Sequence, residues 1–327
     1  MPAIFTQDVQ MHVDRHGRNA LDRAATSGDL GAVSLLLAQE TTEINKQTGS
    51  QKLTPLIRAS KSGHLNVVAA LLTHRADPNI EARHGTALYV ASKFGHMPVV
   101  DILVDNGAYI DYQTKGCRFT PLHAAVIKGH VEVTQLLLDR GADVNLETKE
   151  LCTPLHEAAR SGNDEIVKLL IDKGASVNHR NRDHFTALHI SALRGHLAVV
   201  QVLVRHGGAD VRAKTRVDHL TPLHVAANMG KTDVLSFLLN SGADVDSEDA
   251  DRGTPLHGAA RHGQLAAAKL LVEAEADVSR RDVDKLTPVD YASEKARYEE
   301  DKDETQFKEL VLFFQDHLAA KEHLIKL

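Results

Sequence analysis

Cysteine is scarce in this sequence: among its 327 residues, only Cys117 and Cys152 carry a thiol. Two cysteines do not make the disulfide framework of a small secreted domain. The first residues, MPAIFTQDVQMHVDRHGRN, lack the apolar core of a secretory signal. No apolar run approaches the roughly 18 residues that a membrane-spanning helix needs. We therefore expect no membrane segment, and a location in the reducing cytoplasm and/or nucleus.

An excess of positive charge is also missing. The 38 Lys and Arg residues are outnumbered by 44 Asp and Glu residues, which gives a formal net charge of −6. Proteins that bind nucleic acids or membrane surfaces in general do so with an overall basic surface. The charge balance therefore disfavours both classes of partner.

The sequence contains none of the common catalytic or cofactor motifs. There is no Walker loop, no GxGxxG after a strand, no GxSxG and no HExxH. We expect no enzyme activity, no catalytic residue and no cofactor. An enzyme or small-molecule binder assembled from several parts of the chain stays an alternative, because such a site needs no local motif.

What the sequence does contain is a repeat. The stretch CTPLHEAARSGNDEIVKLLIDKGASVN, residues 152–178, restates FTPLHAAVIKGHVEVTQLLLDRGADVN, residues 119–145. Further copies align on the threonine of the TPLH segment and follow one another at 32 to 35 residues. A period near 33 that continues over most of a chain indicates a solenoid. The aligned threonines are Thr54, Thr86, Thr120, Thr153, Thr186, Thr221, Thr254 and Thr287, and a ninth, degenerate copy opens at Asn19.

Each repeat predicts two helices joined by a turn. The threonine can accept a hydrogen bond from the backbone N–H three residues on, and a proline such as Pro121 suits the first helical position. A glycine such as Gly129 ends the first helix. A second helix follows with apolar residues at i, i+3 and i+4, as at Val133, Leu136 and Leu137. One such unit cannot bury its apolar face, so we expect the units to stack.

The TPLHxAA…G…LLxxGADVN pattern resembles the ankyrin repeat, and the resemblance covers about residues 18–290. It implies an all-α solenoid in which hairpin tips and first helices line a concave groove that binds partners. We divide the chain into an N-terminal segment (1–17), the repeat array (18–290) and an acidic insertion with a capping helix that completes the ninth repeat (291–327). The repeats start near residues 19, 54, 86, 120, 153, 186, 221, 254 and 287.

Departures from the pattern mark the ends of the array. The first repeat carries Asp22 and Asp29, which we expect on a polar end surface. The tip of the third repeat is one residue short. In the last repeat the acidic YEEDKDET precedes QFKELVLFFQDHL, which we interpret as a delayed second helix that caps the array. The alternative is a dimerisation or partner helix that acts through Phe313 and the LIKL end.

Histidine is plentiful, but its positions favour structure over metal binding. The histidines of the TPLH segments recur once per repeat, and packed helices lie about 8–10 Å apart, so neighbours cannot share a zinc ion. We expect no metal site. The resemblance implies that these histidines belong to an internal hydrogen-bond network. They are His123, His156, His189, His224 and His257, and a second set, His64, His96, His130 and His196, opens second helices.

Cationic residues occupy two positions that the repeat does not dictate. Helix dipoles favour cations at the ends of first helices by about 0.3–1 kcal/mol, but they do not explain cations before a helix. The sequence therefore predicts two cationic rows, which either suit an acidic partner or reflect the structure of the repeat alone. The helix-end row is Lys61, Lys93, Lys128, Arg160, Arg194 and Arg261. The tip row, two residues before each threonine, is Lys, Arg or His at seven of eight positions: Lys52, His84, Arg118, Leu151, His184, His219, Arg252 and Lys285.

Larger side chains within the expected groove are candidate anchors for a partner. Tyr89 replaces the motif histidine in the third repeat, and Phe94 and Met229 stand at the groove-end position where another repeat has His262. Local packing variation is the alternative interpretation.

Three tip asparagines, Asn79, Asn145 and Asn178, stand eight residues after a leucine. The resemblance makes them candidate sites of asparagine hydroxylation. The alternative is that each asparagine stabilises its loop.

We therefore predict a non-enzymatic scaffold or adaptor that mediates protein–protein interaction through its groove, with an acidic or extended segment of another protein as the partner. We expect a monomer or weak dimer, with nucleic acid disfavoured and no membrane partner. The alternatives are the enzyme or small-molecule binder and an oligomeric structural component built through the C-terminal helix.

Overall fold

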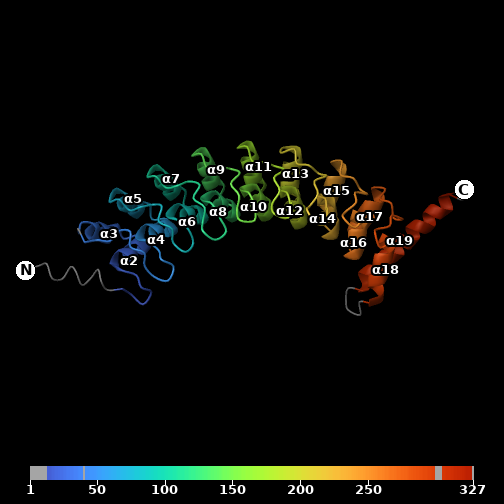
Figure 1. Ribbon diagram of the computed structural model, residues 1–327, viewed down its shortest axis with the longest axis horizontal. Helices are drawn as coiled ribbons and strands as arrows, with labels where there is room; N and C mark the ends of the chain where they lie inside the picture. Colours follow the sequence, from blue (N-terminus) through green and yellow to red (C-terminus); the bar gives the residue numbers. More distant parts are fainter. Residues whose placement is uncertain (1–12, 40, 299–303, 326–327) are drawn as a thin grey trace, which may run out of the picture. The chain divides into compact units, whose positions relative to one another are not determined.

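The computed structural model describes residues 13–39, 41–298 and 304–325, and the regular elements within these ranges are all helices (Figure 1). The only other pairing among these residues is the isolated bridges Thr48–Leu53 and Ala82–Gly85 in two hairpin tips. None of the described helices has the length and apolar character to cross a bilayer. The prediction of an all-α solenoid is confirmed.

Every repeat contributes one first helix and one second helix. The first helices are α2 (Ala20–Ser27), α4 (Pro55–Ser62), α6 (Ala87–Phe94), α8 (Pro121–Lys128), α10 (Pro154–Ser161), α12 (Ala187–Arg194), α14 (Pro222–Asn228), α16 (Pro255–Arg261) and α18 (Pro288–Tyr298). The second helices are α3 (Leu30–Leu37), α5 (Leu65–Thr73), α7 (Met97–Asp105), α9 (Val131–Asp139), α11 (Asp164–Asp172), α13 (Leu197–Arg205), α15 (Thr232–Asn240), α17 (Leu265–Glu273) and α19 (Glu304–Ile325).

Local sequence sets where the first helices begin and end. The hydroxyl of Thr54 accepts from the backbone N–H of Ile57 at 3.2 Å, and that of Thr120 accepts from His123 at 3.3 Å. The helix that follows Thr54 ends at Gly63, whose φ of 75° is left-handed and favours glycine. These N-caps and stops match the sequence prediction.

The chain consists of two compact units, Met1–Ala158 with Asp172–Ala175, and Ala159–Ile171 with Ser176–Leu327. In the first unit α2, α4, α6 and α8 pack in one layer, and α3, α5, α7 and α9 pack in a second layer (Figure 1). The second unit repeats this arrangement with α12, α14, α16 and α18 in one layer and α13, α15, α17 and α19 in the other. Leucines and valines of consecutive repeats are buried in this arrangement, Leu88 of α6 and Leu122 of α8 among them.

The delayed helix α19 packs against α17 and α18. Phe307, Leu310 and Phe314 are buried there, with Phe314 fully inaccessible. Phe313 is half-buried, and the ammonium of Lys269 lies 5.8 Å from its ring centroid. This packing is what a cap requires. The side chains of the LIKL end lie outside the described residues.

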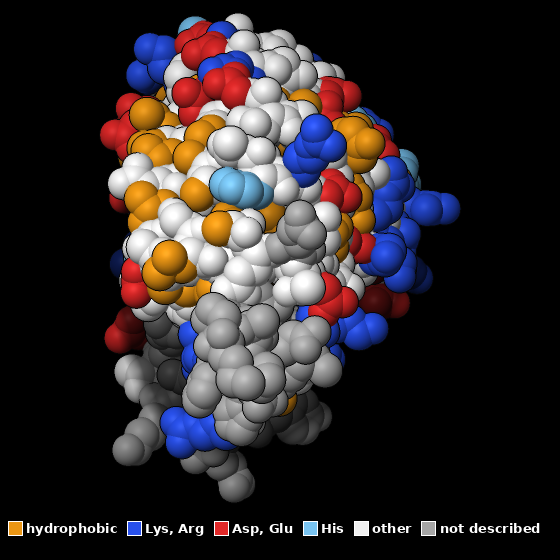
Figure 2. All heavy atoms as spheres, turned by 90° about the vertical axis from the view of Figure 1, so that its left-hand side faces the viewer, with side chains coloured by type: hydrophobic (Ala, Val, Ile, Leu, Met, Phe, Trp, Pro, Cys, Tyr) orange, Lys and Arg blue, Asp and Glu red, His pale blue; other side chains and the backbone are white. Residues whose placement is uncertain are grey.

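The first repeat differs from the polar end surface that we expected. Asp29 is exposed and caps α3, but Asp22 is completely buried, so its expected position was wrong. Of α3 only Val33 is buried, whereas Leu30 and Leu35 are exposed, the latter by 73%. Hydrophobic side chains are accordingly visible on the end of the molecule that faces the viewer in Figure 2.

Candidate partner-binding surface

The helix-end cations of the first unit lie in the last turns of α4, α6 and α8. Lys61 and Lys128 are exposed and Lys93 is partly exposed. Because these helices pack beside one another, a lysine recurs in each layer. We call Lys61, Lys93 and Lys128 the first-helix row.

The first-helix row is electrostatically unpaired. None of its lysines forms an ion pair with any residue that the structure describes. Two cations at the ends of second helices in the same unit are paired instead. Arg140 pairs with Asp101 and Asp105, and the Lys173 ammonium lies 2.7 Å from Asp139. Positive charge in this unit is therefore available along the first helices.

The helix-end cations of the second unit lie in two kinds of surroundings. Arg160 and Arg194 are exposed at the ends of α10 and α12. Arg261 donates to the Tyr291 hydroxyl at 2.7 Å, and its guanidinium lies 4.4 Å from the Tyr291 ring centroid. Arg261 and His262 also line a cavity of about 300 Å³ with four carboxyl groups, so that the positive charge of Arg261 is offset locally. The carboxyl groups belong to Asp218, Asp249, Asp251 and Asp282.

The tip row shares an unusual backbone conformation. Seven of its eight residues have φ between 52° and 64°, in the left-handed region that costs a residue with a side chain roughly 1–2 kcal/mol. The exception is His84, because Gly85 takes the positive φ in the shortened third tip. The seven are Lys52, Arg118, Leu151, His184, His219, Arg252 and Lys285, of which only His184 is partly buried.

The candidate anchors occupy different surroundings. Phe94 is 45% exposed, stacks on His96 with ring centroids 6.4 Å apart, and lies 5.8 Å from the Lys61 ammonium. Tyr89 is half-buried and lines a cavity of about 210 Å³ together with Lys93. Met229 is 45% exposed at the end of α14. Only Tyr89 among these three faces a cavity that also holds a member of the first-helix row.

The motif histidines form the hydrogen-bond network that the resemblance implied. Nδ1 of His123 accepts from the backbone N–H of Thr120 at 3.3 Å, and its Nε2 faces the carbonyl of Cys152 at 3.3 Å. The same arrangement joins His189 to the Leu220 carbonyl at 3.0 Å. Burial lowers the pKa of His123 and His189 to about 4. These histidines are therefore neutral links between consecutive tips.

The histidines that precede second helices also join neighbouring repeats. Nε2 of His96 faces the carbonyl of Lys61 at 3.0 Å, and that of His130 faces the carbonyl of Lys93 at 3.1 Å. They hold the helix ends that carry the first-helix row. Within the described ranges, no three His, Cys, Asp or Glu side chains come together as metal ligands could.

The tip asparagines bridge adjacent loops. Asn79 donates to the Gly107 carbonyl at 2.9 Å and accepts from the Tyr109 N–H at 2.8 Å. Asn145 donates to the Gly174 carbonyl at 3.2 Å, and Asn178 accepts from the Asp210 N–H at 2.8 Å. Each therefore stabilises its loop, and asparagine hydroxylation at these positions stays a prediction.

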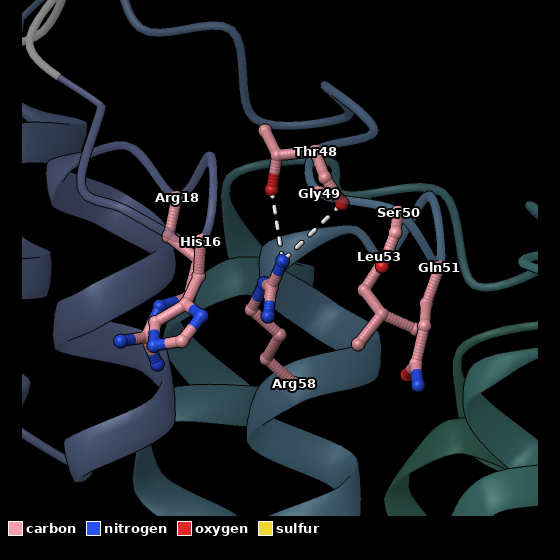
Figure 3. Close-up of a pocket in the computed structure, with 8 residues that line it drawn as sticks. All are labelled: His16, Arg18, Thr48, Gly49, Ser50, Gln51, Leu53 and Arg58. Atoms are coloured by element: carbon pink, nitrogen blue, oxygen red, sulfur yellow. Dashed lines mark hydrogen bonds between the residues drawn. The ribbon is translucent and has the colours of Figure 1, made fainter.

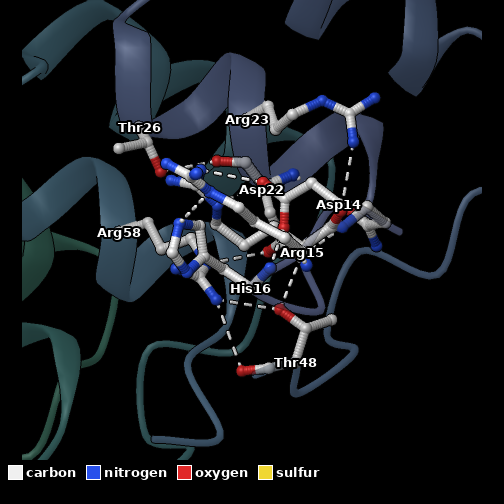
Figure 4. A network of polar contacts seen from close by, with 10 residues as sticks. Asp14, Arg15, His16, Asp22, Arg23, Thr26, Thr48 and Arg58 are labelled. Atoms are coloured by element: carbon white, nitrogen blue, oxygen red, sulfur yellow. Dashed lines mark hydrogen bonds and ion pairs between the residues drawn. The ribbon is translucent and has the colours of Figure 1, made fainter. Parts of the chain in front are cut away.

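Sequence reasoning missed a buried polar network in the first repeat. Asp22 accepts from the Thr48 hydroxyl at 2.6 Å and from Nε of Arg58 at 3.1 Å. Figure 4 shows these contacts. Asp22 stands where other repeats have the motif histidine, and this alignment could have revealed its role.

Arg58 also borders the surface beside this network. Its guanidinium points toward Thr48, as Figure 3 shows, with 2.9 Å between Nη2 and the Thr48 hydroxyl oxygen. Arg58 and Thr48 line a cavity of about 280 Å³ together with His16 and Arg18. Since the ion pair with Asp22 already engages Arg58, we assign this region a structural role.

Comparison with known proteins supports the repeat. A family model for ankyrin repeats matches residues 21–114, 88–181, 147–215, 176–249 and 208–282. Similar proteins include alpha-latrocrustotoxin-Lt1a from Latrodectus tredecimguttatus (34% identity over 90 residues, 27% of this chain and 6% of the toxin). Ankyrin repeat and KH domain-containing protein 1 from Homo sapiens is 36% identical over 107 residues, 32% of this chain and 4% of that protein.

A third relative, the B-cell lymphoma 3 protein homolog from Mus musculus, is 38% identical over 111 residues, which are 33% of this chain and 24% of the relative. Each match spans only a small part of these longer proteins. The shared feature is therefore the repeat itself.

Proposed function

Since the chain belongs to the ankyrin-repeat family, whose repeats are in general protein–protein interaction modules and typically non-catalytic, we propose that it is a scaffold or adaptor. It binds another protein with its first-helix ends and hairpin tips. The partner presents an acidic, extended segment. The observation that carries this proposal is the unpaired first-helix row, in contrast to Arg140 and Lys173 at second-helix ends, which are paired with carboxylates.

The tip row supports the same partner chemistry. Glycine would relieve the left-handed backbone at these positions, yet six of the seven left-handed residues are Lys, Arg or His. Backbone energetics therefore oppose the residues that are present. Recognition of a negatively charged partner would explain why cationic side chains occupy these left-handed positions despite the backbone free energy that they cost.

We propose that binding takes place in the reducing cytoplasm or nucleus. Cys117 is an exposed free thiol and Cys152 is a buried one, which supports this compartment. Microscopy of the fluorescently tagged chain in its source cells tests the proposal, and a secreted product would contradict it.

A capture experiment tests the proposed surface. The baits are the native chain and a variant with Lys61, Lys93 and Lys128 changed to Gln, which removes charge and keeps most of each side chain. A control variant changes Lys168, Arg205 and Lys269, which are exposed on second helices, to Gln. Circular dichroism first establishes that all three are folded alike.

We expect the native chain and the control to retain the same protein from a lysate of the source cells, and the first-helix variant to lose it. Limited proteolysis of the captured protein then identifies the retained segment, which should be acidic. If the first-helix variant retains as much as the control, partner binding does not use this row.

A further inference from the structure

The third repeat departs from the others at three linked positions. In two other repeats an aromatic residue before the threonine packs on the motif histidine: the rings of Phe119 and His123 are 5.7 Å apart, and those of Phe185 and His189 are 5.5 Å apart. In the third repeat that residue is Gly85, the histidine is replaced by Tyr89, and the tip is one residue shorter.

Gly85 and Tyr89 depend on each other. Gly85 has a φ of 113°, and a β-carbon at this position would lie 2.6 Å from Cδ1 of the Tyr89 ring. Only a glycine therefore lets the tyrosine ring occupy this place. The combination leaves a cavity of about 210 Å³ between the third and fourth tips and the end of α6.

Cationic side chains dominate the lining of this cavity. Arg83, Lys93 and Lys115 contribute three permanent positive charges, and His84 lies beside them. The one carboxylate in the lining, Glu81, lies 3.0 Å from the ammonium of Lys115. Arg83 and Lys93 form no ion pair with a described residue.

A neutral donor completes the lining. Burial, with a smaller contribution from Cys117, raises the pKa of Tyr89, so its hydroxyl keeps its proton at neutral pH. That hydroxyl makes no hydrogen bond with any residue in the described ranges. Charged donors beside a neutral hydroxyl match the acceptor oxygens of a carboxylate or phosphate.

We propose that this cavity, which we call the Tyr89 pocket, binds the oxyanion end of an acidic or phosphorylated side chain of the partner polypeptide. The inference rests on the proposed function and deepens it, because it names one anchoring point where the first-helix row meets the tips. A single small pocket on a chain of net charge −6 favours a side chain over a nucleic-acid backbone.

Cys117 reports on the charge of the pocket directly. It lines the pocket and is exposed, whereas Cys152 is only 4% exposed. We would measure its labelling rate with dianionic 5,5′-dithiobis(2-nitrobenzoate) and with neutral 4,4′-dithiodipyridine. We expect the ratio of these rates to fall about threefold to tenfold in Lys93→Gln and Arg83→Gln, and to fall as salt screens the pocket. Lys168→Gln, which removes an exposed charge on α11, should leave the ratio unchanged.

Binding is tested with fluorescent twelve-residue peptides: one of Glu and Ser, the same peptide with one phosphoserine, and a Lys and Ser control. We expect an acidic peptide to bind and to protect Cys117, and Lys93→Gln and Tyr89→Phe to weaken it about threefold to tenfold. The two acidic peptides distinguish carboxylate from phosphate. A single-stranded oligonucleotide is tested in the same way. If it protects Cys117 better than either acidic peptide, the pocket binds nucleic acid and the proposal of a polypeptide partner is wrong.

Unchanged rate ratios in the pocket variants, or equal peptide affinities, would overturn the proposal. Capture of the partner by these variants distinguishes a failure of the Tyr89 pocket from a failure of the adaptor function. If Tyr89→Phe and Arg83→Gln retain it fully while the first-helix variant loses it, the adaptor function stands and the Tyr89 pocket does not anchor the partner.

Discussion

At the residue scale, the left-handed tip positions are the most unusual feature of the chain. A side chain in this region costs roughly 1–2 kcal/mol, and glycine recovers this cost but increases the entropy of the unfolded chain. Replacing Lys52, His219 and Lys285 by Gly should therefore raise the free energy of unfolding by about 0.5 kcal/mol each, measured by urea denaturation. The three positions have positive φ and lie in different repeats, so their effects should add.

Lys61→Gly provides the control for this prediction. Lys61 lies in a helix, where glycine is unfavourable by about 0.5–1 kcal/mol. It should lower stability. A loss of stability in the tip variants as well would contradict the assigned strain.

The buried histidines predict acid sensitivity. Burial lowers the pKa of His123, His189 and His224 to about 4, against an ordinary 6.5. Between pH 6.5 and 4 the unfolded chain binds protons that the folded chain does not, so stability falls as pH falls. Each histidine contributes up to about 3 kcal/mol by pH 4.

Urea denaturation at several pH values measures this slope. His189→Gln should reduce the slope between pH 6.5 and 4, although it also lowers stability at pH 7. A flat profile over this interval would show that these histidines are protonated in the folded chain.

The buried Asp22 predicts a strong local effect. Asp22→Ala leaves Arg58, whose side chain is 11% exposed, without its carboxylate partner. Breaking such a pair costs about 3–5 kcal/mol, so we expect a loss of about 3 kcal/mol in stability and fast hydrogen exchange in α2. The exposed cap Asp29→Ala should cost only about 1 kcal/mol. Equal losses for both variants would contradict the role of the network.

At the element scale, substitutions in α19 distinguish its two possible roles, a cap on the array and a dimerisation helix. Phe314 is fully buried against the array, and Phe→Ala in a core costs about 3–5 kcal/mol. We expect Phe314→Ala to destabilise by that amount, and Phe313→Ala to cost about 1 kcal/mol and leave the mass from light scattering unchanged. A mass that falls with Phe313→Ala would favour the dimerisation helix.

The elements themselves were largely predictable from local sequence. Thr120, Pro121 and Gly129 bound α8 because caps and stops act within a few residues. The sequence did not reveal that Leu35 of α3 is exposed, because its burial depends on whether another repeat covers it. The bounds of a helix are local, whereas its burial is not.

At the scale of the whole molecule, we expect partner binding to depend on salt. The chain carries a net charge of −6, yet the first-helix row is positive and unpaired. Raising ionic strength from 0.05 to 0.3 M should weaken binding about fivefold to tenfold, because exposed charges are screened over about 10 Å or less. Isothermal titration of the native chain and the first-helix variant measures this dependence. The variant should lose most of it, and an equal dependence in both would place the interacting charges elsewhere.

The sequence by itself determined the repeat, the family and the helices, because all of these follow from residues at fixed spacings within one unit, and the family resemblance implied the structural role of the motif histidines. Only the tertiary structure decided which cations are available. Lys93 is unpaired, Arg261 lies among carboxyl groups, and Asp22 is buried against Arg58. These outcomes depend on the charges and side-chain volumes of the neighbouring repeat, about 33 residues away along the chain, which stacking brings into contact.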